Sequence, residues 1–204
     1  MKVIVTEPER RDNNINDSAL HKVAHNMQIY TLADTALLTH GKPMFIPDYG
    51  GECSALCCLA FRICRLGKSI PERFAYRYFD AFTVGVRFEL SDLREKLSQQ
   101  QLPWDVAVSF DGAATIGSFT EHDGKTEDDC ELKLEVDSVA VVSERLSGIN
   151  QRVAQALSEV SRYYMIRQGD VLFIPMTDKP FRANQDTHYG GCINGVKVLD
   201  FNVK

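Results

Sequence analysis

The sequence predicts a single α+β domain, residues 1–204, in which strands outnumber helices. Short apolar runs and alternating patterns typical of strands recur along the whole chain, whereas helical periodicity is confined to a few stretches. A length of 204 residues suits one domain with a sizeable core, and 44% hydrophobic with 25% charged residues is the balance of a globular protein. Within this domain we expect 1–45 to be a divergent N-terminal part and 46–204 to be the core.

The N-terminal half begins with a short strand at 2–5 and a polar loop. Residues 18–27 have helical character with Ser18 as N-cap. Residues 55–64 are apolar on both faces, which indicates a buried strand. A helix is then expected near Ser69, with Pro71 in its first turn, running through 73–79.

The remaining elements follow the same two patterns. Alternation predicts strand at 80–90, and again at 132–136 carrying on into 139–142. The segments 92–101 and 145–164 are expected to be helices, the first polar and the second with Val153, Leu157 and Val160 on one side. Gly169 opens a turn before a strand, and Asn194-Gly195 predicts a hairpin turn between two C-terminal strands.

Composition and charge exclude several classes of function. A net charge of −5 and a pI near 5.5 argue against nucleic-acid binding, which depends on clustered Lys and Arg. No apolar stretch approaches the ~20 residues that span a bilayer, so no membrane association is expected. The N-terminus lacks the apolar region of a secretory signal, and six cysteines are too few for a disulfide scaffold. We therefore expect a cytoplasmic protein.

The cysteines and histidines are candidate metal ligands, but their spacing does not favour a metal site. Cys53, Cys57, Cys58 and Cys64 lie in or near one predicted strand, where neighbouring side chains point to opposite faces, so buried inert thiols are the better interpretation than zinc ligands. His21 and His25 would share a helix face, but the sequence nominates no further ligand beside them.

Other polar residues have ordinary interpretations. His188 and Tyr189 are placed in a polar loop before two glycines, where they could line a pocket, and His40 and His122 are expected in solvated loops. Asp111 is expected to shape a tight turn rather than to catalyse.

Two stretches resemble the fumarylacetoacetate hydrolase family. They are Arg62-Ile-Cys-Arg-Leu-Gly-Lys-Ser-Ile-Pro-Glu-Arg-Phe-Ala-Tyr-Arg-Tyr-Phe-Asp-Ala-Phe-Thr-Val-Gly85 and Pro103-Trp-Asp-Val-Ala-Val-Ser-Phe-Asp-Gly-Ala-Ala-Thr-Ile-Gly-Ser-Phe119, followed in order by similar segments at 169–173 and 195–204. The resemblance implies a strand-rich, rolled mixed β-sandwich with a few peripheral helices, often dimeric. It also implies Mg²⁺ or a similar ion holding an enolate-like intermediate of an oxo-acid.

The chain departs from this family at the positions that would hold the metal. Counted without a gap, the Glu-x-Glu pair falls on Leu56 and Cys58, and the third carboxylate falls on Arg87. An alkyl group, a thiol and a guanidinium give a hard cation no oxygen ligand. A rival register would place Glu52-Cys53-Ser54 on the pair and rescue one carboxylate.

Further departures surround these positions. The family lysine before Phe110-Asp111 is Val108, and the Thr-Gly-Thr-Pro turn is replaced by the four residues Ile174, Pro175, Met176 and Thr177. The N-terminal His and Glu pair that activates water in the family falls on Asn13 and Asn16.

The sequence therefore predicts a catalytically inactive family member without a cofactor. It would act as a partner subunit, in a homodimer or with an active paralogue, or bind a small carboxylate through Arg87. The alternative is a hydrolase or isomerase of oxo-acids with a rebuilt site, with Mg²⁺ or Mn²⁺ if that site takes a metal. We expect Leu56, Cys58, Arg87 and Val108 to converge in space.

Overall fold

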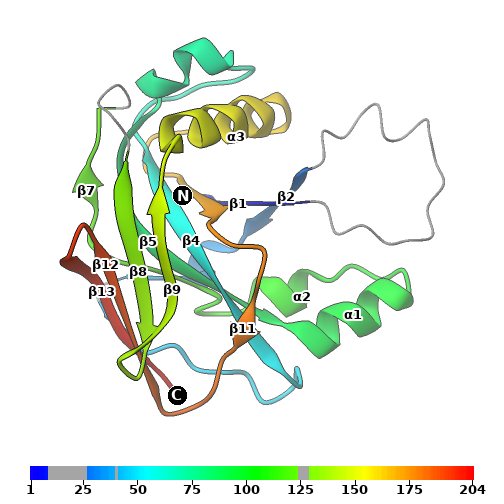
Figure 1. Cartoon of the computed structure of the whole chain (residues 1–204). Coiled ribbons are helices and arrows are strands. Elements are labelled where there is room, and N and C mark those ends of the chain that lie inside the picture. Colours follow the sequence, from blue (N-terminus) through cyan, green and yellow to red (C-terminus); the bar gives the residue numbers. More distant parts are fainter. Residues whose placement is uncertain (9–26, 40, 124–128) are drawn as a thin grey trace.

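The computed structural model describes residues 1–8, 27–39, 41–123 and 129–204, which form two β-sheets and a few helices (Figure 1). The larger sheet is mixed and has the order β2-β1-β10-β4-β5-β6-β3, with β11 beside β4 and β7 beside β5. Its strands are β1 (Val3–Pro8), β2 (Met27–Leu32), β3 (Leu37–Leu38), β4 (Cys53–Ile63), β5 (Phe79–Leu90), β6 (Ala114–Ile116), β7 (Thr120–Glu121), β10 (Val171–Pro175) and β11 (Phe181–Arg182).

The smaller sheet is antiparallel, in the order β13-β12-β8-β9. Its strands are β8 (Cys130–Val136), β9 (Val139–Leu146), β12 (Thr187–Ile193) and β13 (Val196–Val203). The helices are α1 (Ser91–Gln99), α2 (Asp105–Val108) and α3 (Ile149–Tyr163), with short 3₁₀ turns η2 (Asp34–Ala36) and η3 (Glu72–Arg77). The predicted strand-rich rolled fold with few helices is confirmed.

The long β4–β5 pair is the centre of the larger sheet. Cys53 to Ile63 pair with Phe79 to Leu90 along their whole length, so that Leu56 lies opposite Arg87 and Cys58 opposite Gly85. Successive side chains of a strand point to opposite faces, and each strand of the pair therefore divides its residues between two environments. One face packs against the smaller sheet, where the ring of Phe88 contacts the rings of Tyr189 and Phe201.

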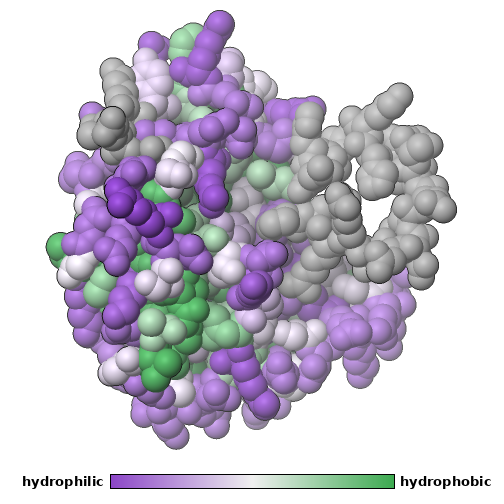
Figure 2. Space-filling model, in the orientation of Figure 1, coloured by the Kyte–Doolittle hydropathy of each residue, from purple (hydrophilic) through white to green (hydrophobic). Residues whose placement is uncertain are grey.

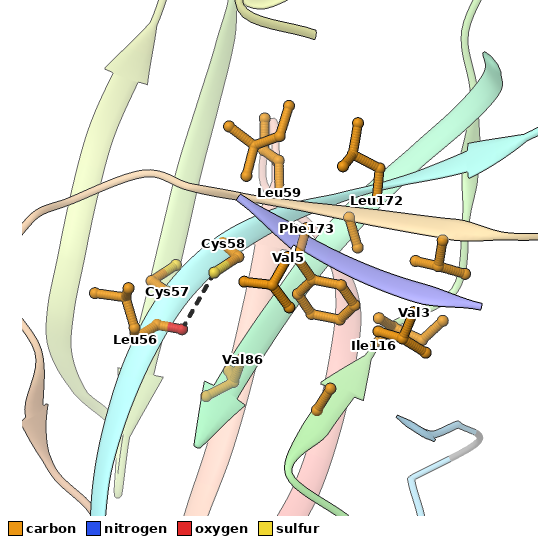
Figure 3. Packing of buried hydrophobic residues seen from close by; sticks show 14 of the residues in the cluster. Val3, Val5, Leu56, Cys57, Cys58, Leu59, Val86, Ile116, Leu172 and Phe173 are labelled. Carbon is orange, nitrogen blue, oxygen red and sulfur yellow. Dashed lines mark hydrogen bonds between the residues drawn. The ribbon is translucent and has the colours of Figure 1, made fainter. Parts of the chain in front are cut away.

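The other face of β4 carries Leu56 and Cys58 (Figure 3). Here a Cβ on Gly85 would lie 2.7 Å from the ring of Phe173, a distance too short for any other side chain. Val5 lies opposite Phe173 in the β1–β10 pair, so Glu7, two residues further along β1, shares the face of Phe173. This face is the one that bears the candidate site.

Most predicted elements are present, with shifts at their ends. Strands predicted at 2–5, 55–64 and 80–90 are β1, β4 and β5, the strand predicted after the turn at Gly169 is β10, and the helix predicted at 92–101 is α1. The predicted Asn194-Gly195 turn is confirmed, since both residues have positive φ angles, of 50° and 76°, between β12 and β13. The helix predicted through 73–79 is the 3₁₀ turn η3, and the helix predicted from Arg145 begins at Ile149.

Two predictions about connections are wrong. Residues 132–142 are a hairpin rather than a continuing strand, because Asp137 and Ser138 adopt positive φ angles of 49° and 67° and reverse the chain. His188 and Tyr189 lie in β12 rather than in a loop. They point to opposite faces: Tyr189 is buried against Phe201, whereas His188 is partly exposed and its Nε2 lies 2.5 Å from Asp200.

His122 is not a solvated loop residue either. Its ring packs against Phe79 and Phe82, at 5.9 and 5.3 Å between centroids, and its Nε2 lies 2.7 Å from Oδ1 of Asn150. Asp111 is exposed in the turn that was predicted for it. The helix expected at 18–27 lies outside the described residues, except for Met27 in β2, as do Asn13, Asn16, His21, His25 and His40.

In the described part of the chain, no helix is long and apolar enough to cross a bilayer. Figure 2 shows hydrophobic residues gathered over the smaller sheet, and Val139 and Val141 on its edge strand β9 are exposed.

Candidate functional site: a buried arginine–glutamate cluster

Arg87 is the centre of a buried ion cluster on the face of the larger sheet defined above. Its Nη2 lies 2.7 Å from Oε1 of Glu7, and its Nη1 lies 2.9 Å from Oε2 of Glu89. The three side chains are between 2% and 5% exposed. Glu89 follows Arg87 by two residues on β5 and thus shares its face, whereas Glu7 comes from β1.

Arg94 of α1 completes the cluster. Its Nη1 contacts Oε2 of Glu89 and lies 3.5 Å from Oε2 of Glu7, and its Nη2 donates to Oε1 of Gln28 at 2.8 Å. The hydroxyl of Tyr30 donates to Oε1 of Glu7 at 2.7 Å. Since β1 ends one residue after Glu7 and β2 begins one residue before Gln28, Arg94 ties both strands to α1.

Aromatic rings close the cluster on the side of Arg94. Its guanidinium lies 4.5 Å from the ring centroid of Trp104 and 5.9 Å from that of Tyr30. The two rings pack edge to face at 5.2 Å. Such rings attract a cation and exclude water, which strengthens the neighbouring ion pairs.

The charges inside the cluster balance. Two arginines face two glutamates, and buried charges are tolerated in proteins when they are paired in this way. Burial alone would lower the pKa of Arg87, but the neighbouring carboxylates of Glu7 and Glu89 raise its pKa above the ordinary value, so it stays charged. Burial, opposed by Arg87, raises the pKa of the Tyr30 hydroxyl, which therefore stays protonated as a donor.

Three of the four predicted pocket positions meet at this cluster. Leu56 lies directly opposite Arg87, and Cys58 lies two residues along the same strand, with its thiol 3.6 Å from the carbonyl of Leu56 (Figure 3). Val108 is buried in α2, a helix that contacts β5. Phe110 is buried and Asp111 exposed beside it.

The predicted turn 174–177 lies at the end of β10. Pro175 is opposite Cys58, the amide of Met176 donates to the carbonyl of Cys57 at 3.0 Å, and Thr177 Oγ1 accepts from the amide of Lys179. Pro175, Met176 and Thr177 also line a groove of about 640 Å³ whose other wall is β9. Ile174 is buried.

The donor set does not fit a divalent cation. Leu56 has no donor atom, and burial raises the pKa of the Cys58 thiol to about 12, which keeps it protonated. The carboxylates of Glu7 and Glu89 are already neutralised by Arg87 and Arg94. Within the described ranges, no three His, Cys, Asp or Glu side chains are grouped so as to hold a metal.

The rival register does not supply a site. Glu52 lies before β4, its side chain is 46% exposed, and its carboxylate is 3.9 Å from Arg182. Ser54 shares the face of Leu56, and its Oγ accepts a hydrogen bond from Ser91 at 2.8 Å. With either register, Arg87 with Glu7 and Glu89 remains at the centre of the candidate site.

Sequence reasoning found Arg87 but missed its partners. The proximity of Arg87 and Glu89 could be predicted, because residues two apart on a strand share a face. Glu7 could not be predicted as a partner, since two strands lie between β1 and β5 in the sheet and Glu7 is 80 residues away from Arg87 in the chain.

The four crowded cysteines do not surround a common point. Cys57 and Cys58 are adjacent on β4 and point to opposite faces, so they cannot bind one ion together. Cys53, Cys57 and Cys58 are buried, and Cys64 lies beyond the end of the strand.

We expect only two thiols to react with Ellman's reagent in the native protein. Cys64 and Cys192 are partly exposed, whereas Cys53, Cys57, Cys58 and Cys130 are buried. Burial also raises the pKa of Cys58 to about 12 and that of Cys53 to about 11, which disfavours the reactive thiolate. All six should react in denaturant, and native reaction of the thiol at 58, tested with Cys58→Ser, would contradict the burial of this site.

Comparison with known proteins agrees with the fold. Residues 6–174 match the family model described as fumarylacetoacetate (FAA) hydrolase C-terminal. The mitochondrial oxaloacetate tautomerase FAHD1 of Pongo abelii is 22% identical over 180 residues, which cover 86% of this chain and 80% of that protein.

Solved structures are similar over the whole chain. A fumarylpyruvate hydrolase from Pseudomonas aeruginosa, in complex with Mn²⁺ and pyruvate, is 18% identical with a TM-score of 0.81, covering 100% of this chain and 89% of that one. A 2-hydroxyhepta-2,4-diene-1,7-dioate isomerase from Mycobacterium marinum is 17% identical with a TM-score of 0.78, and the match covers 99% of this chain and 73% of that one.

Proposed function

The chain belongs to the fumarylacetoacetate hydrolase family, and from that premise we propose that it is a member without metal-dependent chemistry. The observation that carries the proposal is the position of Arg87. A guanidinium held by Glu7 and Glu89 lies where the family resemblance expects a carboxylate that binds metal. A metal ion contributes to such reactions by stabilising negative charge on the substrate oxygens, and the described residues form no group of carboxylates, histidines or cysteines that could hold one.

The role of the protein is then that of a partner subunit, in a homodimer or with an active paralogue. Binding of a small carboxylate through Arg87 is disfavoured by the geometry, since this side chain is 2% exposed and two of its nitrogens already contact glutamates. A ligand would have to break both ion pairs in a buried environment, and each broken pair leaves an uncompensated charge.

The second candidate is an oxo-acid hydrolase or isomerase that works without metal. It is favoured by the named activities of the relatives, which include a tautomerase, a hydrolase and an isomerase. Such an enzyme would need other groups to stabilise an enolate, and the groove beside 175–177 contains Arg145, Arg152 and Lys179. Resistance of turnover to EDTA separates this candidate from the first.

We expect the purified protein to show no Mg²⁺- or Mn²⁺-stimulated turnover of oxaloacetate, fumarylpyruvate or fumarylacetoacetate. The Pseudomonas aeruginosa fumarylpyruvate hydrolase, assayed in parallel with its namesake substrate, is the control that shows the assay works. Saturable metal-dependent turnover would overturn the proposal. Turnover that survives EDTA and is lost in Arg152→Ala would favour the second candidate.

A further inference from the structure

A short antiparallel bridge joins the loop after β4 to the loop after α3. The amides of Gly67 and Ile166 each donate to the carbonyl of the other, at 3.0 and 2.9 Å. Ile166 is fully buried, and a Cβ on Gly67 would lie 2.5 Å from the ring of Tyr78, so both bridged residues point into the molecule. The residues on either side of them in the two loops therefore point outwards together.

The outward side of this bridge alternates apolar and cationic side chains. Leu66 lies opposite Arg167, and Lys68 lies opposite Met165, as the antiparallel register requires. Leu66 is 60% exposed and Met165 is 48% exposed. Tyr163 is 49% exposed, and its carbonyl accepts a hydrogen bond from Nζ of Lys68 at 2.7 Å. Three large apolar side chains are thus exposed among cations.

The segments around the bridge form a basic region in an acidic protein. Seven of the 23 Lys and Arg residues, but only two of the 28 Asp and Glu residues, lie in 62–78 and 158–168. These segments therefore carry a net charge of +5 and the rest of the chain −10. In this region η3 packs against α3, at the end of the molecule away from β11 (Figure 1). Screening limits the reach of each charge to about 8 Å at physiological salt, so a surface that approaches this end meets mainly its cations.

Four arginines of this region carry uncompensated charge. Among the described residues, no carboxylate forms an ion pair with Arg65, Arg73, Arg77 or Arg167. The guanidinium groups of Arg73 and Arg77 lie 4.8 and 5.0 Å from the ring centroid of Phe74, which orders them without neutralising them. A guanidinium in this state can bind the oxygens of a phosphate or a carboxylate.

We propose that this end of the molecule binds an anionic lipid surface, with Leu66 and Met165 entering the headgroup region and the arginines binding the headgroups. A bilayer interface offers negative charge and apolar chains at the same place, which suits the alternation of Leu66 with Arg167. An acidic polypeptide would offer mainly the charge, and a second copy bound face to face would bring two basic regions together. Binding to a lipid surface needs no spanning helix, so the sequence-based expectation of no membrane association, which was drawn from spanning segments, does not extend to it.

The test measures sedimentation of the purified protein with sucrose-loaded vesicles. One set contains phosphatidylcholine alone, and the other contains about 30% phosphatidylserine. We expect binding only to the second set at about 0.1 M NaCl, and its loss at about 0.5 M NaCl, where the charges are screened.

Two double variants separate the apolar from the charged contribution. Leu66→Ser with Met165→Ser keeps every charge and should weaken vesicle binding about tenfold, because two apolar contacts are lost. Arg65→Gln with Arg167→Gln should weaken it about 25-fold, at about fivefold for each charge near the surface. All four side chains are exposed, so the fold should be kept.

Matched control variants lie elsewhere on the surface. Val196→Ser removes an apolar side chain that is 64% exposed, and Arg182→Gln removes an exposed cation from β11. Neither should change vesicle binding. A polarity-sensitive fluorophore on Met165→Cys, in a background of Cys64→Ser and Cys192→Ser, should shift its emission to the blue on phosphatidylserine vesicles, because the label leaves water.

Four results would overturn the proposal. They are no binding to phosphatidylserine vesicles, equal binding to phosphatidylcholine alone, unchanged binding by Leu66→Ser with Met165→Ser, and an equal affinity for poly-L-glutamate, which would identify a site for acidic polypeptides. The proposed function is tested separately, by metal-stimulated turnover without lipid, so either proposal can fail while the other holds.

Discussion

Arg87→Met is expected to lower the free energy of unfolding by about 3–5 kcal/mol, the cost of leaving one partner of a buried ion pair uncompensated. Methionine fills much of the arginine volume, so the loss reports charge rather than a cavity. Glu7 and Glu89 would keep their contacts with Arg94, but the buried cluster would lose one of its two guanidinium charges. Urea unfolding followed by circular dichroism measures the change.

The double variant Arg87→Met with Glu89→Met tests the charge balance of the cluster more strictly. It leaves Glu7 with Arg94 as a neutral pair, and it should therefore be more stable than the sum of the single variants predicts. Arg145→Met is the control for a generic loss of an ion pair. Its contact to Asp129 at 3.5 Å is largely exposed, so we expect a change of about 0.5 kcal/mol or less. Equal losses in Arg87→Met and Arg145→Met would contradict the charge-balanced cluster.

Alkaline pH is expected to destabilise the protein steeply above pH 9. Burial raises the pKa of Cys58 to about 12 and of Cys53 to about 11, from an ordinary value of 9.0. The folded state holds both protons while the unfolded chain releases them, so the stabilisation is complete below pH 9 and is lost as pH rises towards 11–12. At pH 10.5 each thiol should account for about 2 kcal/mol of lost stability.

Urea titrations at pH 8, 9, 10 and 10.5 measure this dependence. Cys58→Ser removes one ionisable thiol with little change in shape, and it should reduce the slope of stability against pH by about 1.4 kcal/mol per unit between pH 9 and 10.5. Leu59→Ala, on the same strand, is the control: it should lower stability equally at every pH, because it removes no titratable group. An unchanged slope in Cys58→Ser would show that this thiol is accessible to water in the folded protein.

The face of the larger sheet that carries positions 56 and 58 also carries the buried ion network of Arg87. Arg87 lies opposite Leu56 and belongs to a set of ion-paired side chains that reaches from β1 to α1. A buried ion network is a weak source of stability by itself, because desolvation offsets much of the attraction. Its clearest effect is to link β1, β2, β5 and α1, since Arg87 and Arg94 together contact side chains from β1, β2 and β5.

The sequence by itself determined the strands, the family and the identity of position 87. Apolar runs and alternation locate β4, β5 and β10, because burial of one or both faces of a strand is a local property of its residues. The Asn194-Gly195 turn follows from backbone sterics alone. The sequence also indicated that position 87 holds no carboxylate, because this depends only on the identity of one residue.

Only the tertiary structure decided what Arg87 does. From the sequence, a guanidinium there looked available to an anion, whereas the fold brings Glu7 to it from another strand and Arg94 and Trp104 from the segments after β5. The same limit explains His122 and Tyr189, whose polar surroundings in the sequence hid their packing against aromatic rings. Pairing between distant segments depends on sheet order and register, which no local pattern encodes. The partners of a buried charge are therefore fixed only when the whole sheet is assembled.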